Sequence, residues 1–188
     1  MSIQRSGNNF IDVNVVDDLS RLRAEQLGIS EKSLLAAGRR AANKTARWLQ
    51  TRVKRLMAGY LETPQKNIKQ RVHLRTAKGR ETVAYLWIGE NPVDPVSLNR
   101  KAENIGTGAI SGNWYFEGGF EATMPSGKRA IFKRRNRKRL KIDVQMVEVE
   151  PVIEANLDRL VAQANRRLQT VTEQEINFEL LKANKAVA

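Results

Sequence analysis

The sequence contains no cysteine and a single histidine, His73. Without cysteine there is no disulfide, no thiol nucleophile and no cysteine-ligated metal site. One histidine also excludes a site built on several imidazoles. His73 alternates with apolar neighbours, so we interpret it as an ordinary histidine on the surface of a sheet. We therefore expect neither a metal nor a cofactor.

Long apolar runs are also missing. The longest, Val83–Ile88, is far shorter than the ~18 residues that a membrane span requires. Residues 1–7 lack the apolar core of a signal peptide. These absences predict a soluble protein that has no membrane partner.

The carboxylate pattern of a metal-dependent nuclease is absent as well. Such enzymes cluster acidic residues on a strand, often with a lysine two positions beyond one of them, and no Asp or Glu here has that neighbour. Glu148 and Glu150 would share a strand face, but they have no evident catalytic companion. We expect no enzymatic activity and no small-molecule substrate.

Positive charge is abundant. The chain has 33 Lys and Arg against 20 Asp and Glu, a formal net charge of +13. Most of the excess lies before residue 142, whereas the last segment is acidic. A basic body of this kind favours a polyanionic partner or an acidic protein surface.

Hydrophobic periodicity predicts two long helices, one from about Ser30 to Tyr60 and one opened by Pro151. Between them, alternating and β-branched stretches predict β-hairpins. The fold class is therefore α+β, an antiparallel β-sheet of hairpins packed against a long N-terminal and a long C-terminal helix.

We expect a single domain over residues 1–188. Residues 1–29 would form an N-terminal arm with a short strand at 11–15, where apolar and polar residues alternate. Residues 91–112, rich in glycine and proline, would form a long loop. The capping-box pattern at 172–175 indicates a separate helix, so residues 172–188 would be a C-terminal extension.

The densest signal is a group of nine basic residues within fourteen positions, framed by apolar residues that place it on a folded hairpin. Such density is costly unless an anion relieves the repulsion, so we predict contact with DNA phosphates or with an acidic partner subunit. A solvated, charged turn is the alternative. No groove-reading motif is present. The nine residues are Lys128, Arg129, Lys133, Arg134, Arg135, Arg137, Lys138, Arg139 and Lys141.

Aromatic residues give a weaker signal. Trp114, Tyr115 and Phe116 follow the long predicted loop and are candidates for a subunit contact. Trp48 and Trp87 are expected in the core. The basic face of the 30–60 helix is interpreted as solvated.

One stretch resembles a known family. From Phe116 to Arg134 the sequence has a glycine–phenylalanine step, a turn glycine, and a phenylalanine followed by basic residues. An apolar strand and a helix opened by Pro151 follow this stretch. This order of parts is similar to the prophage minor tail protein Z family of lambda-like tail completion proteins. The similarity covers about residues 30–170 and is specific over about 112–152.

The resemblance implies a non-enzymatic phage tail component that completes the head-proximal tail end and assists head–tail joining and placement of the DNA end. It implies tail and neck subunits as partners, contact with the double-stranded DNA end, and a homo-oligomeric ring. The protein would reside in the virion tail, and in the host cytoplasm during assembly. The alternative from another class is a free, sequence-nonspecific nucleic-acid-binding protein.

Overall fold

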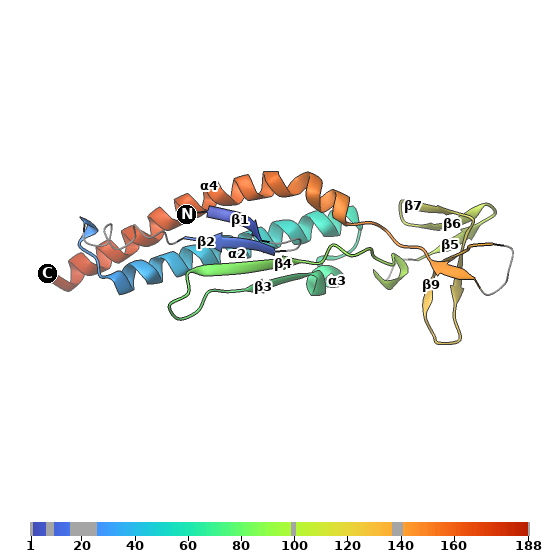
Figure 1. The fold of residues 1–188 in the computed structure, drawn as a ribbon, viewed down its shortest axis with the longest axis horizontal. Coiled ribbons are helices and arrows are strands. Elements are labelled where there is room, and N and C mark those ends of the chain that lie inside the picture. Colours follow the sequence, from blue (N-terminus) through green and yellow to red (C-terminus); the bar gives the residue numbers. More distant parts are fainter. Residues whose placement is uncertain (1, 7–9, 16–25, 99–100, 137–140, 188) are drawn as a thin grey trace. The chain divides into compact units, whose positions relative to one another are not determined.

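The computed structural model describes residues 2–6, 10–15, 26–98, 101–136 and 141–187. Within them the fold is α+β, with antiparallel sheets and a long helix near each end, which confirms the predicted class (Figure 1).

Where one domain was expected, the chain forms two compact units. Unit 1 comprises Met1–Lys54, Gln70–Gly89 and Ala155–Ala188, and unit 2 comprises Arg55–Lys69 and Glu90–Glu154.

Unit 1 contains a four-stranded antiparallel sheet in the order β1-β2-β4-β3. Burial alternates along its strands, as in β4, where Ala84, Leu86 and Ile88 are buried and the residues between them are half-exposed. One face is therefore apolar and covered. The bounds are β1 Ser2–Ser6, β2 Phe10–Asn14, β3 Val72–Arg75 and β4 Val83–Ile88.

Two helices, α2 (Glu31–Tyr60) and α4 (Glu150–Val187), supply the cover of that sheet and lie alongside each other in unit 1 (Figure 1). Many of the buried positions of α2 are alanine, which lets neighbouring elements pack closely; Ala37, Ala41, Ala42 and Ala46 are fully buried. The Ser30 hydroxyl caps α2 by accepting a hydrogen bond from the Ser33 amide at 3.1 Å. Among the described residues, no helix is long and apolar enough to cross a membrane.

Unit 2 contains two three-stranded antiparallel sheets, in the orders β5-β6-β7 and β10-β9-β8. Ile131 of β9 is fully buried and packs with Val96, Ala102 and Ala109, with Phe116 beside them. This small cluster fixes the hairpin to the rest of the unit. The bounds are β5 Glu103–Ile105, β6 Gly108–Ser111, β7 Trp114–Glu117, β8 Gly119–Thr123, β9 Arg129–Arg134 and β10 Ile142–Val144, with α3 at Gln65–Ile68 and short 3₁₀ turns at Lys69–Arg71 and Val96–Leu98.

The prediction that residues 91–112 form a long loop is wrong. This stretch contains a 3₁₀ turn, β5 and β6, and strands of three or four residues leave too short a pattern to recognise against so much glycine and proline. Gly108, which indicated a loop, is instead a strand residue. A Cβ there would lie 2.3 Å from the Phe116 carbonyl oxygen, so only glycine permits the close approach of β6 and β7.

The two predicted terminal segments also differ from the structure where it describes them. The strand predicted at 11–15 is confirmed as β2, but β1 and β2 both belong to the unit 1 sheet, with Ile3, Ile11 and Val13 buried, so this part of the chain is not an arm. The extension at 172–188 is a continuation of α4. The Thr172 hydroxyl donates to the Leu168 carbonyl at 2.7 Å inside the helix and so does not cap a new one.

Candidate functional site

The predicted basic hairpin is formed by β8, β9 and β10. The chain passes from one sheet to the other at Gly118, whose φ of 67° is in the left-handed region, and turns between β8 and β9 at Gly127, with φ 80°. Six of the nine basic residues are described. Arg137, Lys138 and Arg139 lie outside the described residues.

Strand alternation divides the basic residues of β9 between two faces. Arg129 and Lys133 lie on the same face as the buried Ile131, because residues two apart share a face of a strand. Arg134 lies on the opposite face, where its guanidinium is 5.4 Å from the centre of the Phe120 ring. The cluster is therefore not one continuous basic surface.

Two arginines have carboxylate partners within the hairpin. Arg129 of β9 forms an ion pair with Glu121 on the neighbouring strand β8. Arg135, just after β9, donates two hydrogen bonds, at 2.5 and 2.8 Å, to the carboxylate of Asp143 on β10. These hydrogen bonds hold the pKa of Asp143 below its usual range. Both pairs are solvent-exposed, so they orient the arginines more than they stabilise the fold.

The sequence interpretation did not identify these partners, although their spacing carried a signal. Glu121 is eight residues before Arg129, and Asp143 is eight residues after Arg135. In a hairpin, such symmetric spacing places residues diagonally opposite each other. Lys128, Lys133 and Lys141 are exposed and make no ion pair with the described residues. Together with Arg134, whose guanidinium lies over the Phe120 ring, they carry the unpaired charge of the hairpin's described residues.

The three aromatic residues of β7 also divide between faces. Trp114 is half-buried, with its ring centre 6.0 Å from that of Tyr60 in an edge-on arrangement, and Phe116 packs against the Ile131 cluster. Tyr115 faces solvent at 49% exposure, with its hydroxyl held 2.9 Å from that of Thr107. Of the three, Tyr115 is the residue that a subunit could contact.

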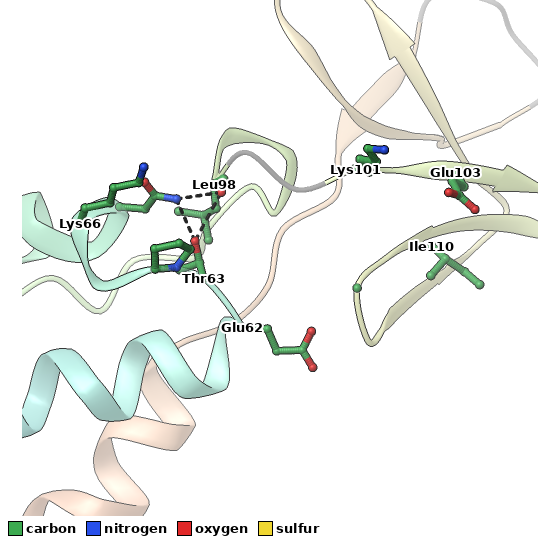
Figure 2. A pocket seen from close by; sticks show the side chains of 10 residues that line it. Glu62, Thr63, Lys66, Leu98, Lys101, Glu103 and Ile110 are labelled. Carbon is green, nitrogen blue, oxygen red and sulfur yellow. Dashed lines mark hydrogen bonds between the residues drawn. The ribbon is translucent and has the colours of Figure 1, made fainter.

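Unit 2 also has a polar cavity of about 580 Å³ (Figure 2). The Asn67 amide donates hydrogen bonds at 2.9 Å to both the Thr63 hydroxyl and the Leu98 carbonyl. Those donors are therefore used in holding the wall of the cavity together. Its lining residues are Glu62, Thr63, Pro64, Lys66, Asn67, Leu98, Lys101, Glu103, Ile110 and Gly112.

Within the described part of the chain, no group of three or more His, Asp or Glu side chains is placed to hold a metal ion. His73 lies on the open face of the unit 1 sheet, its ring 5.4 Å from that of Trp87 on the neighbouring strand. The arrangement that remains is electrostatic: lysines on a rigid hairpin that could bind an anionic surface. No protein-family model, curated protein or solved structure matches this chain.

Proposed function

We propose that this chain is a non-enzymatic structural component of a phage tail, which completes the head-proximal tail end and assists head–tail joining and placement of the DNA end. The observation that carries the proposal is the resemblance over residues 116–134. The residues that carry the resemblance lie on the β8–β9 hairpin. The Gly119-Phe120 step is on β8, the turn is at Gly127, and Phe132 precedes the basic residues on β9.

The chemistry of the hairpin supports docking to an acidic rim of neighbouring tail or neck subunits. Arg129 and Arg135 are oriented by carboxylates of the hairpin itself. Lys128, Lys133 and Lys141 present exposed ammonium groups. Exposed cations facing an acidic surface raise the association rate and fix orientation, which suits an assembly step.

Sedimentation of a phage lysate tests the assignment. We expect the wild-type protein to co-migrate with tails and whole particles. The variant Lys128→Glu/Lys133→Glu/Lys141→Glu should remain at the top of the gradient, because three reversed charges oppose docking.

A matched control reverses three equally exposed charges in unit 1, Lys32→Glu/Lys78→Glu/Arg80→Glu, and should still co-migrate. Wild-type protein found only at the top of the gradient, free or bound to loose nucleic acid, would overturn the tail assignment and favour the free nucleic-acid-binding protein. Loss of co-migration in the control as well would show that net charge, and not the hairpin, governs docking.

A further inference from the structure

A second basic surface lies on the paired helices of unit 1. It consists of five exposed arginines, two of which contact the half-buried Trp48, and we call it the arginine face. Two of the arginines are on α2 and three are on α4. They are Arg47, Arg52, Arg159, Arg166 and Arg167.

Trp48 brings the two helices' arginines together. The guanidinium carbon of Arg52 is 5.2 Å from the centre of the indole ring, and that of Arg167 is 5.6 Å from it. Both are within the range of a cation–π contact. Because the two charged groups are already held in place, less side-chain entropy is lost when they bind an anion.

Helical spacing extends this surface along α4. At 100° per residue, Arg159, Arg166 and Arg167 lie within a sector of about 100°. Arg159 is further oriented by a 2.8 Å hydrogen bond from its guanidinium to the Asn156 side-chain oxygen. The three side chains therefore leave the same side of the helix, as a row and not as isolated charges.

Among the described residues, no carboxylate neutralises the arginine face. The sequence has no acidic residue between Glu31 and Glu62, or between Asp158 and Glu173. At one end, Arg40 and Lys44 are neutralised by Glu175 and Glu179 of α4, at 2.5 to 2.6 Å. The five arginines themselves form no ion pair with the described residues.

The composition of the face distinguishes a nucleic acid from a protein partner. Protein interfaces have an apolar centre with exposed aromatic or aliphatic side chains. Along 45–54 and 155–172, all of which are described, no large apolar side chain is exposed; the exposed ones on α4 are Phe178 and Leu181, beyond this region. The one large aromatic side chain of the face, Trp48, is half-buried and has Arg52 and Arg167 over its ring. Arginines that present charge and little apolar surface match the uniform charge of a phosphate backbone.

We propose that the arginine face binds the phosphate backbone of double-stranded DNA without reading its sequence. This inference does not depend on the tail assignment, because it concerns a different surface and a different partner from those of the lysine hairpin.

Fluorescence anisotropy with a labelled 30-base-pair duplex tests it. If four or more phosphates are contacted, the wild-type affinity should fall about a hundredfold between 50 and 200 mM salt. The variant Arg47→Gln/Arg52→Gln/Arg166→Gln/Arg167→Gln should bind more than about tenfold more weakly at 50 mM salt, and the slope of log K against log salt should be shallower by about three units.

The matched control removes the same charge from exposed positions elsewhere in unit 1: Lys32→Gln/Lys78→Gln/Arg80→Gln/Lys182→Gln. It should keep most of the affinity and the wild-type salt slope. Arg52→Lys/Arg167→Lys keeps the charge but loses the planar groups held over Trp48, and should bind more weakly than the wild type but more tightly than the quadruple variant. Circular dichroism melts confirm that each variant is folded.

Three outcomes would overturn the proposal. The wild-type protein could fail to bind the duplex at 50 mM salt. The control could lose as much affinity as the quadruple variant, which would mean that net charge alone governs binding. Polyglutamate could compete as well as DNA at equal charge concentration, which would indicate an acidic protein partner. None of these results bears on co-migration with tails, so the two proposals fail separately.

Discussion

The basic hairpin and the arginine face differ in how much of their charge is available. The hairpin is the denser in sequence, with nine basic residues within fourteen. Yet Arg129 forms an ion pair with Glu121, and Arg135 forms one with Asp143. The arginine face is sparser in sequence, but its charges have no carboxylate partners in the described structure. Charge density along a chain is therefore a poor measure of the charge that a partner meets.

Secondary structure explains the difference. A hairpin brings together residues that are eight positions apart, so acidic residues outside the basic run can reach it. On a helix, a side chain meets mainly those three or four positions away. An acid-free stretch of helix therefore has few local sources of neutralisation, and only a neighbouring element can supply one.

The largest effect should come from breaking the hairpin's support. In Gly108→Val, the new Cβ would lie 2.3 Å from the Phe116 carbonyl oxygen. That oxygen belongs to the backbone, which cannot easily give way. We expect a loss of about 3 kcal/mol in unit 2. Hydrogen exchange should rise across β6 to β9, while duplex affinity through the arginine face is unchanged.

The control for that prediction is Gly106→Ala. A Cβ at Gly106 meets nothing within 4 Å, so this variant should leave exchange rates as they are. A fall in duplex affinity in Gly108→Val would show that DNA binding depends on unit 2, which would contradict the separation of the two surfaces.

The next effect concerns the neutralised end of the helix pair. Glu175 is only 6% exposed and accepts from both Arg40 and Lys44 at 2.5 Å. Glu175→Gln should lower the free energy of unfolding by about 2 kcal/mol, less than for a fully buried pair because Arg40 and Lys44 partly face water. It should also strengthen duplex binding, since Lys44 loses its ion pair and Arg40 keeps only the one to Glu179. Urea unfolding and anisotropy measure the two effects.

Glu173→Gln is the matched control, because it removes the same charge from an exposed position on the same helix. It should change stability little and affinity less than Glu175→Gln does. Equal gains in affinity would mean that only net charge matters and that the ion pairs do not withhold Arg40 and Lys44.

The sequence predicted the fold best where a regular apolar spacing continues over many residues. The helix from about Ser30 to Tyr60 matches α2 almost to the residue, because its apolar spacing persists over eight turns and a serine caps it. The failures were short or context-dependent. β5 and β6 have three or four residues each, and Thr172 has the sequence of a cap but bonds within a continuous helix.

For the candidate surfaces, sequence identified the charges but not their partners. The contact of Arg167 with Trp48 joins residues more than a hundred positions apart, so no local pattern could reveal it. The contact of Arg52 with Trp48, four positions apart on one helix, is local and could have been predicted. Trp48 was expected in the core and is instead half-buried at the edge of the helix pair. Its place in the apolar spacing of the helix predicted burial, but the guanidinium groups of Arg52 and Arg167 lie over its ring.

Acid should weaken the helix pair in a defined direction. Burial alone would raise the pKa of Glu175, but hydrogen bonds from Lys44 and Arg40 outweigh it and hold the pKa below its usual range. A carboxylate whose pKa is lowered by folding stabilises the fold above the unfolded pKa of about 4.3. That contribution is lost as the pH falls through the folded value.

The measurement is the difference in unfolding free energy between wild type and Glu175→Gln at several pH values. The difference should be constant above about pH 5, and it should shrink below the usual Glu range as Glu175 takes up a proton. A difference that stays the same at low pH would mean that the ion pairs contribute nothing beyond packing.

The smallest effect on stability should come from the hairpin's own ion pair. Asp143→Asn removes the partner of Arg135, but both side chains are exposed, so water and salt screen their attraction. Urea unfolding should not resolve the change, yet co-sedimentation with tails should survive higher salt, because Arg135 adds a free cation to Lys128, Lys133 and Lys141. If the variant instead lost tail association at unchanged stability, the pair would be needed to hold the hairpin's binding shape. Pairing would then serve recognition directly, and the contrast between neutralised and available charge would apply only to the helices.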